Sequence, residues 1–236
     1  MNTGAGKFFE EGQILSFDKP VYWTSFDLVN KIRIMIRTST GIKKIKVGHA
    51  GTLDPLAEGL MIVCTGSATK RIEEFRNLDK EYIATVHLGE TTPSFDLETE
   101  VNGHFPTGHI TKEMVETALA GFLGETQQLP PLYSAKFIDG KRAYEFARKG
   151  VEKKLNAVKV TIREAELLEF DLPKVKVRLL CSKGTYIRSF ARDLGIALGS
   201  GAYLSALQRT VIGPFTVGEA WSLEKFNIFL EQMKQT

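Results

Sequence analysis

The stretch Val47-Gly-His-Ala-Gly-Thr-Leu-Asp-Pro-Leu-Ala-Glu-Gly-Leu60 joins a glycine-rich loop to the start of an apolar run. Its glycines allow tight bends and a close approach of a ligand to the backbone. Asp54 precedes Pro55, which favours an extended or turn geometry, and residues 59–65 (GLMIVCT) predict a buried strand. Loops held by rigid elements often present catalytic groups, so the Asp54 carboxylate is a candidate reactive group. The alternative is that Asp54-Pro55 only initiates a turn.

A second unusual stretch, Cys181-Ser-Lys-Gly-Thr-Tyr-Ile-Arg188, ends one apolar strand and begins a helix. Arg188 is expected in the first helical turn, where the helix dipole disfavours a cation. A carboxylate partner would explain this position, because an Arg–Asp pair keeps the acid ionised and oriented. A surface arginine is the alternative. His49 lies on the glycine-rich loop, which favours exposure, and Tyr82 is either a cross-strand aromatic or a stacking platform.

Composition is that of an ordinary globular protein, with 236 residues, 43 % apolar and 25 % charged. The sequence has no apolar run long enough for a transmembrane helix, and acids near its N-terminus do not fit a secretory signal. The cysteines, Cys64 and Cys181, are too few for a disulfide framework or a four-cysteine zinc site. We expect both to be buried thiols in a reducing compartment.

The net charge of +3 conceals an uneven distribution. Residues 31–46 contain six basic side chains and no acid, and residues 136–154 contain seven basic side chains against three acids. Residues 90–116 reverse the balance, with six acids and one lysine. The basic segments could meet a polyanion such as RNA. Solvated loops and helix faces are the alternative interpretation.

Apolar periodicity predicts strands over 13–18, 59–65, 82–88, 158–163 and 175–181, and helices over 25–37, 67–77, 111–122, 186–198 and from 222 onward. Ser25 is available as the N-cap of its helix, and residues 48–52 are expected to form a loop. The irregular order of strands and helices predicts an α+β domain with a mostly antiparallel sheet. No convincing boundary divides the chain, which predicts a single domain over 1–236.

Several motifs of known nucleotide and hydrolase sites are missing. The sequence contains no GxxxxGK[ST], no GxGxxG after a strand and no GxSxG elbow. Leu56 occupies the position where a magnesium-dependent aspartyl phosphotransferase would need a second acid.

Six segments occur in a recognisable order along the chain: FDKP (17–20), GHAGTLDP (48–55), Tyr82 after DKE, PPLYSAKFIDGKRAYEFARKG (130–150), CSKGTYIRSFARDLG (181–195) and GAYLSALQRT (201–210). In this order they resemble the TruB-type tRNA pseudouridine synthases over roughly residues 13–220. The resemblance implies a pseudouridine-synthase fold, in which helices flank a central, mostly antiparallel mixed sheet and the active cleft crosses that sheet. It implies that uridine 55 in the tRNA T loop becomes pseudouridine, without a metal or organic cofactor.

The resemblance also implies roles for individual residues. Asp54 matches the catalytic aspartate, acting as a nucleophile at C1′ or C6 or as a base at C2′. Arg188 matches the arginine that pairs with it, and Tyr82 the tyrosine that stacks on the target uracil. Other substrate-binding matches are Tyr186 beside the base, Lys19 supporting the pocket, and His49 inserting where the base leaves the stack.

The basic insertion 127–154 resembles the family's clamp over the T stem-loop. The RNA-binding candidates are Lys43, Lys44, Lys46, Lys136, Lys141, Arg142, Arg148 and Lys149. The chain departs from many members in two respects: we expect no C-terminal PUA domain, and residues 91–96 read TTPSFD where an acidic TDTSD-like run is usual. Asp96 is retained.

We expect a cytoplasmic monomer that acts on tRNA, with no membrane association and no protein partner implied.

Two other functions are weighed against catalysis on tRNA. One is an RNA-folding chaperone that has lost catalysis, which the presence of Asp54, Tyr82 and Arg188 disfavours. The other is a metal-dependent aspartyl hydrolase, which would be sensitive to chelators.

Overall fold

The computed structural model describes residues 4–134, 137–138, 140–147, 149, 151 and 155–234. These residues divide into two compact units: the first combines the residues up to Glu81 with those from Gln208 onward, and the second extends from Tyr82 to Leu207. The first unit therefore draws on both ends of the chain, which explains why no single boundary is visible in the sequence. Whether the two units act as one catalytic domain stays a prediction.

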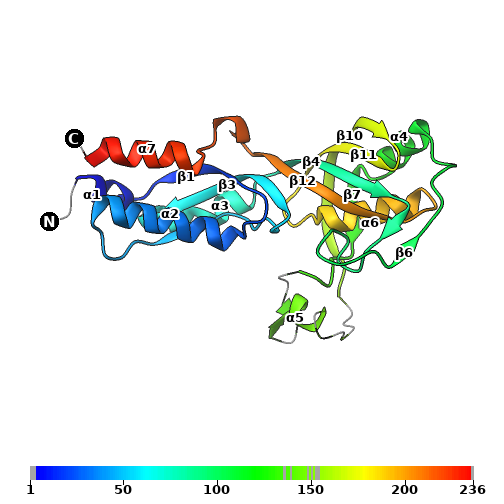
Figure 1. Cartoon of the computed structure of the whole chain (residues 1–236), viewed down its shortest axis with the longest axis horizontal. Helices are drawn as coiled ribbons and strands as arrows, with labels where there is room; N and C mark the ends of the chain where they lie inside the picture. The colour runs from blue at the N-terminus through cyan, green and yellow to red at the C-terminus, as the bar shows by residue number, and fades with distance from the viewer. Residues whose placement is uncertain are drawn as a thin grey trace. The chain divides into compact units, whose positions relative to one another are not determined.

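The first unit contains an antiparallel sheet with helices on its faces (Figure 1). Its elements are α1 (Gly4–Glu11), β1 (Ile14–Lys19), α2 (Ser25–Thr40), β2 (Val47–His49), β3 (Ala57–Thr65), η1 (Gly66–Arg71), α3 (Ile72–Arg76), β13 (Phe215–Thr216), η2 (Val217–Glu219) and α7 (Leu223–Lys234). Strands β4 (Lys80–Leu88) and β12 (Ala202–Ile212) run from one unit into the other. Both β1 and β2 pair antiparallel with β3.

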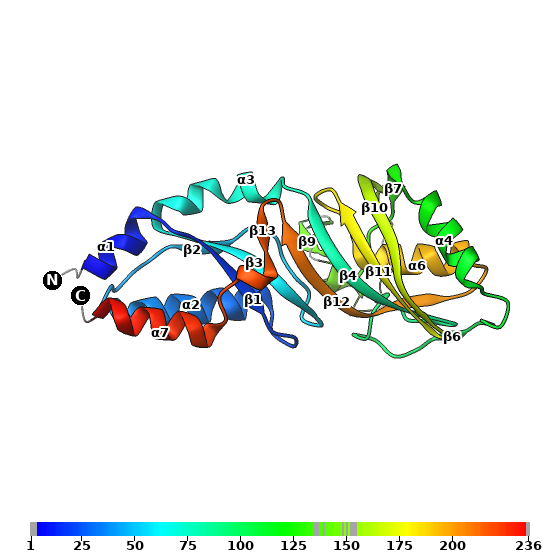
Figure 2. The ribbon, with the colours of Figure 1, turned by 90° about the horizontal axis from the view of Figure 1, so that it is seen from above.

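The core of the first unit lies on both faces of β3, which explains its uninterrupted apolar sequence. Leu60 and Ile62 pack with Phe75 of α3 on one face. On β1, Phe17 lies opposite Met61 and meets Phe226 of α7 edge-to-face at 5.0 Å between ring centroids. Figure 2 shows α3 on the opposite side of β3 from α2 and α7, which lie side by side.

Helix α2 begins with a capping box that corrects the sequence prediction. The N-cap is Thr24, not Ser25: the Thr24 hydroxyl accepts a hydrogen bond from the Asp27 N–H at 3.0 Å. The Asp27 carboxylate in turn accepts from the Thr24 N–H at 2.9 Å. This reciprocal pairing satisfies two backbone donors of the first turn, and it leaves the Ser25 hydroxyl available for another contact.

The second unit is an antiparallel sheet with two principal helices. Its strands lie in the order β12, β4, β11 (Lys174–Cys181), β10 (Val158–Asp171) and β7 (Gly124–Gln128). Its other elements are β5 (Glu90–Thr91), β6 (Gly103–His104), α4 (Lys112–Gly121), β8 (Phe137–Ile138), β9 (Lys141–Arg142), α5 (Ala143–Ala147) and α6 (Ile187–Ala197). Strand β10 pairs antiparallel with both β7 and β11. These pairings confirm the predicted α+β class.

Burial along β4 alternates from Lys80 to Leu88, as the sequence pattern predicts for a strand with one buried face. Helix α4 lies against β10, and Phe122 at its end meets Phe190 of α6 at 5.1 Å between ring centroids. None of the helices in the described part of the chain has the length and apolar character needed to cross a bilayer.

Candidate active site

Asp54 lies half-buried on the loop between β2 and β3. Hydrogen bonds of the loop backbone hold this loop in place. The Asp54 carbonyl accepts from the Ala57 N–H at 3.1 Å, closing a turn through Pro55. The buried Ser25 hydroxyl accepts from the Leu53 N–H at 2.8 Å and donates to the Leu53 carbonyl at 3.0 Å. The residue before Asp54 is therefore tied to the start of α2, and the carboxylate stands on an ordered backbone.

Lys19, at the end of β1, is a fully buried cation in the same unit. Its ammonium donates to the carbonyls of Pro20 at 2.9 Å and Trp23 at 2.7 Å. Burial lowers the pKa of Lys19 to about 8, although the charge of Asp54 acts in the opposite direction. Lys19 and Asp54 are therefore electrostatically coupled, and Lys19 is mostly protonated at neutral pH.

His49 belongs to β2, where it pairs with Val63, so the first residues of the predicted loop are a short strand. Its side chain is half-buried, and the predicted exposure is therefore wrong. Burial is the main cause that lowers the pKa of His49, and the charges of Arg76 and Arg209 lower it further. We therefore expect a neutral imidazole at pH 7.

In the second unit, Arg188 occupies the first turn of α6 and is only 5 % exposed, so a surface arginine is excluded. Its Nη1 lies 3.5 Å from the Asp96 carboxylate and donates to the Ser94 carbonyl at 3.3 Å. Arg188 therefore has a carboxylate neighbour, as its position predicts, but the sequence did not identify Asp96 of the TTPSFD segment as that neighbour. The pairing with Asp54 that the family resemblance implies stays a prediction.

The two candidate tyrosines also lie in the second unit. Tyr82, on β4, is 8 % exposed. Tyr186 is the N-cap of α6 and is half-buried. Gln128, at the end of β7, holds the Tyr186 backbone from both sides: its Oε1 accepts from the Tyr186 N–H at 2.8 Å, and its Nε2 donates to the Tyr186 carbonyl at 3.1 Å.

The basic candidates fall into three groups. Lys43, Lys44, Lys46 and Lys149 are exposed. Lys141 and Arg142 form β9, which pairs with β8 to make a hairpin ahead of α5. Lys136 and Arg148 lie outside the described residues.

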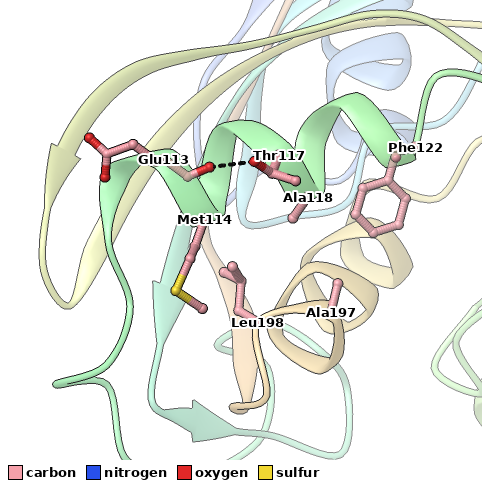
Figure 3. Close-up of a pocket in the computed structure, with 8 residues that line it drawn as sticks. Glu113, Met114, Thr117, Ala118, Phe122, Ala197 and Leu198 are labelled. Atoms are coloured by element: carbon pink, nitrogen blue, oxygen red, sulfur yellow. Dashed lines mark hydrogen bonds between the residues drawn. The ribbon is translucent and has the colours of Figure 1, made fainter.

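A separate pocket of about 610 Å³ lies between α4 and α6 in the second unit. Figure 3 shows Met114, Phe122 and Leu198 around it. The pocket contains none of the candidate residues. Among the described residues, no group of three or more His, Cys, Asp or Glu side chains is placed to hold a metal ion.

Four residues contact candidate groups in a way that the sequence did not predict: Ser25, Asp96, Gln128 and Arg209. Arg209, on β12, donates to the carbonyls of Leu60 and Gly51. The sequence pattern favours a helix cap for Ser25, and all four residues act through partners distant in the sequence.

The sequence of residues 37–187 matches the family described as "TruB family pseudouridylate synthase (N terminal domain)". The chain belongs to the TruB family. The match includes His49, Asp54, Tyr82 and Tyr186 and ends one residue before Arg188. The resemblance noted from the motifs is thus confirmed, and with it the class of enzyme: pseudouridine synthases are isomerases.

Two similar TruB relatives are both named "tRNA pseudouridine synthase B". The protein from Parabacteroides distasonis is 60 % identical over 95 % of this chain and 95 % of its own length. That from Phocaeicola vulgatus is 58 % identical over 96 % of each.

Solved structures show the same fold. One, titled as a Cbf5-Nop10-Gar1 complex, has a TM-score of 0.74 and 28 % identity over 98 % of this chain. Another, titled as an H/ACA RNP bound to a substrate RNA containing 2′-deoxyuridine, has a TM-score of 0.70 and 25 % identity over 97 % of this chain. The chain spans 58 % and 56 % of those two chains, respectively.

Proposed function

We propose that this chain isomerises uridine 55 in the T loop of tRNA to pseudouridine, without a cofactor. Membership of the TruB family and the close relatives named tRNA pseudouridine synthase B support this activity. In the reaction the N1–C1′ bond breaks, the uracil turns, and a C5–C1′ bond forms. The proton at C5 is lost and N1 gains one, so substrate and product have the same composition. The conversion therefore requires no oxidant, reductant or group donor.

The observation that carries the proposal is the Asp54 loop, which combines the family motif with an ordered backbone. The Leu53 bonds to Ser25 and the Ala57–Asp54 turn restrict where the carboxylate can move. A group held in one place reacts with less entropic cost than a mobile one. Asp54 acts as a nucleophile at C1′ or C6, or as a base at C2′.

The other candidate residues would bind the extruded uridine. A base in a folded loop must leave its stack before the glycosidic bond is reached. In the proposal Tyr82 stacks on the uracil, an interaction worth about 1–3 kcal/mol, with Tyr186 near the same base. Arg188 keeps Asp54 ionised, Lys19 supports the pocket, and His49 fills the space that the base vacates.

Exposed lysines would supply the affinity for the RNA backbone. Lys43, Lys44 and Lys46 precede the Asp54 loop, and Lys149 belongs to the proposed clamp over the T stem-loop. Phosphate contacts of this kind make binding weaker as salt increases. In the proposal the protein acts as a monomer in the cytoplasm.

The test is release of tritium from tRNA labelled at C5 of its uridines. Asp54→Asn should lower the rate by roughly 10²-fold or more, because the carboxylate that drives the chemistry is lost. Asp171→Asn, an exposed aspartate at the end of β10, is the matched control and should retain the wild-type rate. Both variants should unfold at the wild-type temperature. Normal turnover by the Asp54 variant would contradict the proposal.

A further inference from the structure

Arg209 is the largest side chain in the described residues that is almost fully buried, with 1 % of its surface exposed. Removing a charged group from water is costly unless hydrogen bonds compensate. Its Nε donates to the Leu60 carbonyl at 2.7 Å, and Nη2 donates to the Gly51 carbonyl at 3.2 Å. Both acceptors belong to the segment that carries Asp54.

These two carbonyls lie on either side of Asp54 in the sequence. Gly51 precedes it by three residues, and Leu60 follows it on β3. One rigid, planar guanidinium can bind two acceptors in a fixed arrangement. Arg209 therefore links the two ends of the loop through one side chain, because it binds the Gly51 and Leu60 carbonyls at the same time.

The backbone also shows a close approach to Arg209. Gly59 has φ +102°, and a Cβ on it would lie 2.9 Å from the Arg209 backbone nitrogen and closer still to its carbonyl oxygen. Gly51 has φ +110°, and a Cβ there would meet the Arg209 guanidinium at 3.6 Å. Glycine permits the left-handed conformation at both positions and, at Gly59, the close approach of the β12 backbone. Gly59 thus lets the segment that carries Asp54 pack directly against the backbone of the strand that carries Arg209.

The charge of Arg209 acts on two candidate residues in the same unit. It lowers the pKa of Lys19, which the carboxylates of Asp54, Glu58 and Asp18 raise. It also lowers the pKa of His49. The arginine is therefore coupled electrostatically as well as through hydrogen bonds to the neighbourhood of Asp54.

We propose that Arg209 is a positioning residue of the isomerase site, holding the segment from Gly51 to Leu60 in the shape that presents Asp54 to the substrate. The inference rests on the proposed function for its effect on catalysis. Arg209 acts through the loop backbone, and the chemistry belongs to Asp54.

The experiment compares Arg209→Met, which removes both bonds, and Arg209→Lys, which keeps a charge but not the planar fork. Arg71→Gln is the matched control, because Arg71 is an exposed arginine of the same unit that pairs with Glu74. We expect kcat for tritium release from tRNA to fall tenfold or more in Arg209→Met, while KM changes less than threefold. Arg209→Lys should be intermediate, and Arg71→Gln should match the wild type.

Hydrogen exchange gives a readout that does not depend on activity. Amides of residues 51–60 should exchange at least tenfold faster in Arg209→Met, whereas those of β1 and α2 should keep their wild-type rates. Faster exchange throughout the first unit would indicate a general structural role for Arg209 and would overturn the proposal. Wild-type exchange of residues 51–60 together with a wild-type kcat in Arg209→Met would overturn it as well. If Arg209→Met does not fold, Arg209→Lys decides by the same criteria.

The two proposals fail in different ways. Wild-type protein that releases no tritium from tRNA would contradict the proposed function, yet the exchange pattern of residues 51–60 would still report on the link through Arg209. An active wild type with an unchanged Arg209→Met variant would contradict the positioning role alone.

Discussion

Lys19 is a fully buried amine whose pKa is lowered from 10.5 to about 8 by burial. Between these values the unfolded chain binds a proton that the folded protein has released. Stability should therefore rise with pH over that window, by roughly 3 kcal/mol for a shift of this size. Below about pH 8 both states bind the proton, and this contribution to the pH dependence vanishes.

Urea unfolding of the wild type and Lys19→Met at several values between pH 7 and 10.5 measures this effect. The methionine variant lacks the titrating amine, so the wild-type stability relative to it should increase over the range. Parallel pH profiles for the two proteins would show that Lys19 titrates near its ordinary pKa in the folded state.

At the residue scale, the sequence identified the groups with unusual chemistry but not those that hold them. Asp54 and Arg188 stand in distinctive motifs, and their local context pointed to a reactive loop and a paired arginine. Arg209 could not be found in this way, because its acceptor at Gly51 lies 158 residues away in the chain. Its residue type suggests a surface position, and only the fold shows that it is buried.

At the scale of elements, the connection between β1 and α2 contains a strained residue beside the candidate loop. Tyr22 has φ +69°, a conformation that costs roughly 1–2 kcal/mol for a residue with a Cβ. Its N–H donates to the Pro55 carbonyl at 2.7 Å, and its side chain is 78 % exposed. The strain therefore accompanies a backbone contact with the residue next to Asp54.

Tyr22→Gly should be as stable as the wild type or up to about 1 kcal/mol more stable, because the relieved strain exceeds the added entropy of the unfolded chain. Val21→Gly, at a neighbouring exposed position without positive φ, should lose roughly 0.5–1 kcal/mol by the entropy effect alone. Thermal and urea unfolding measure both. Equal losses in the two variants would show that Tyr22 is not strained.

The periodicity of apolar residues located most of the long helices and strands, because burial of one face leaves a regular apolar pattern in the sequence. The alternation from Tyr82 to Leu88 and the helical stripe of α6 both appear in the structure. Short or irregular elements were less visible: β2 occupies glycine-rich sequence, and β10 extends to Asp171 through two register shifts against β11 that interrupt its alternation. In these strands pairing with a neighbour, rather than local propensity, determines the conformation.

At the scale of the whole molecule, the first unit is assembled from both ends of the chain. That arrangement has no local signature in sequence, whereas the α+β class follows from the mixture of elements. The family was recognisable because several motifs occur in order, each of them placed on a different element. Asp54, Lys19 and Arg209 belong to the first unit, and Tyr82, Tyr186 and Arg188 to the second.

The most direct test of the proposed function is chemical mapping of pseudouridine in tRNA from cells in which the gene for this protein is deleted. Pseudouridine at position 55 should disappear from the tRNA, return when the wild-type protein is supplied, and remain absent when Asp54→Asn is supplied. Persistence of pseudouridine 55 in the deleted cells, or its restoration by the Asp54 variant, would contradict the assignment.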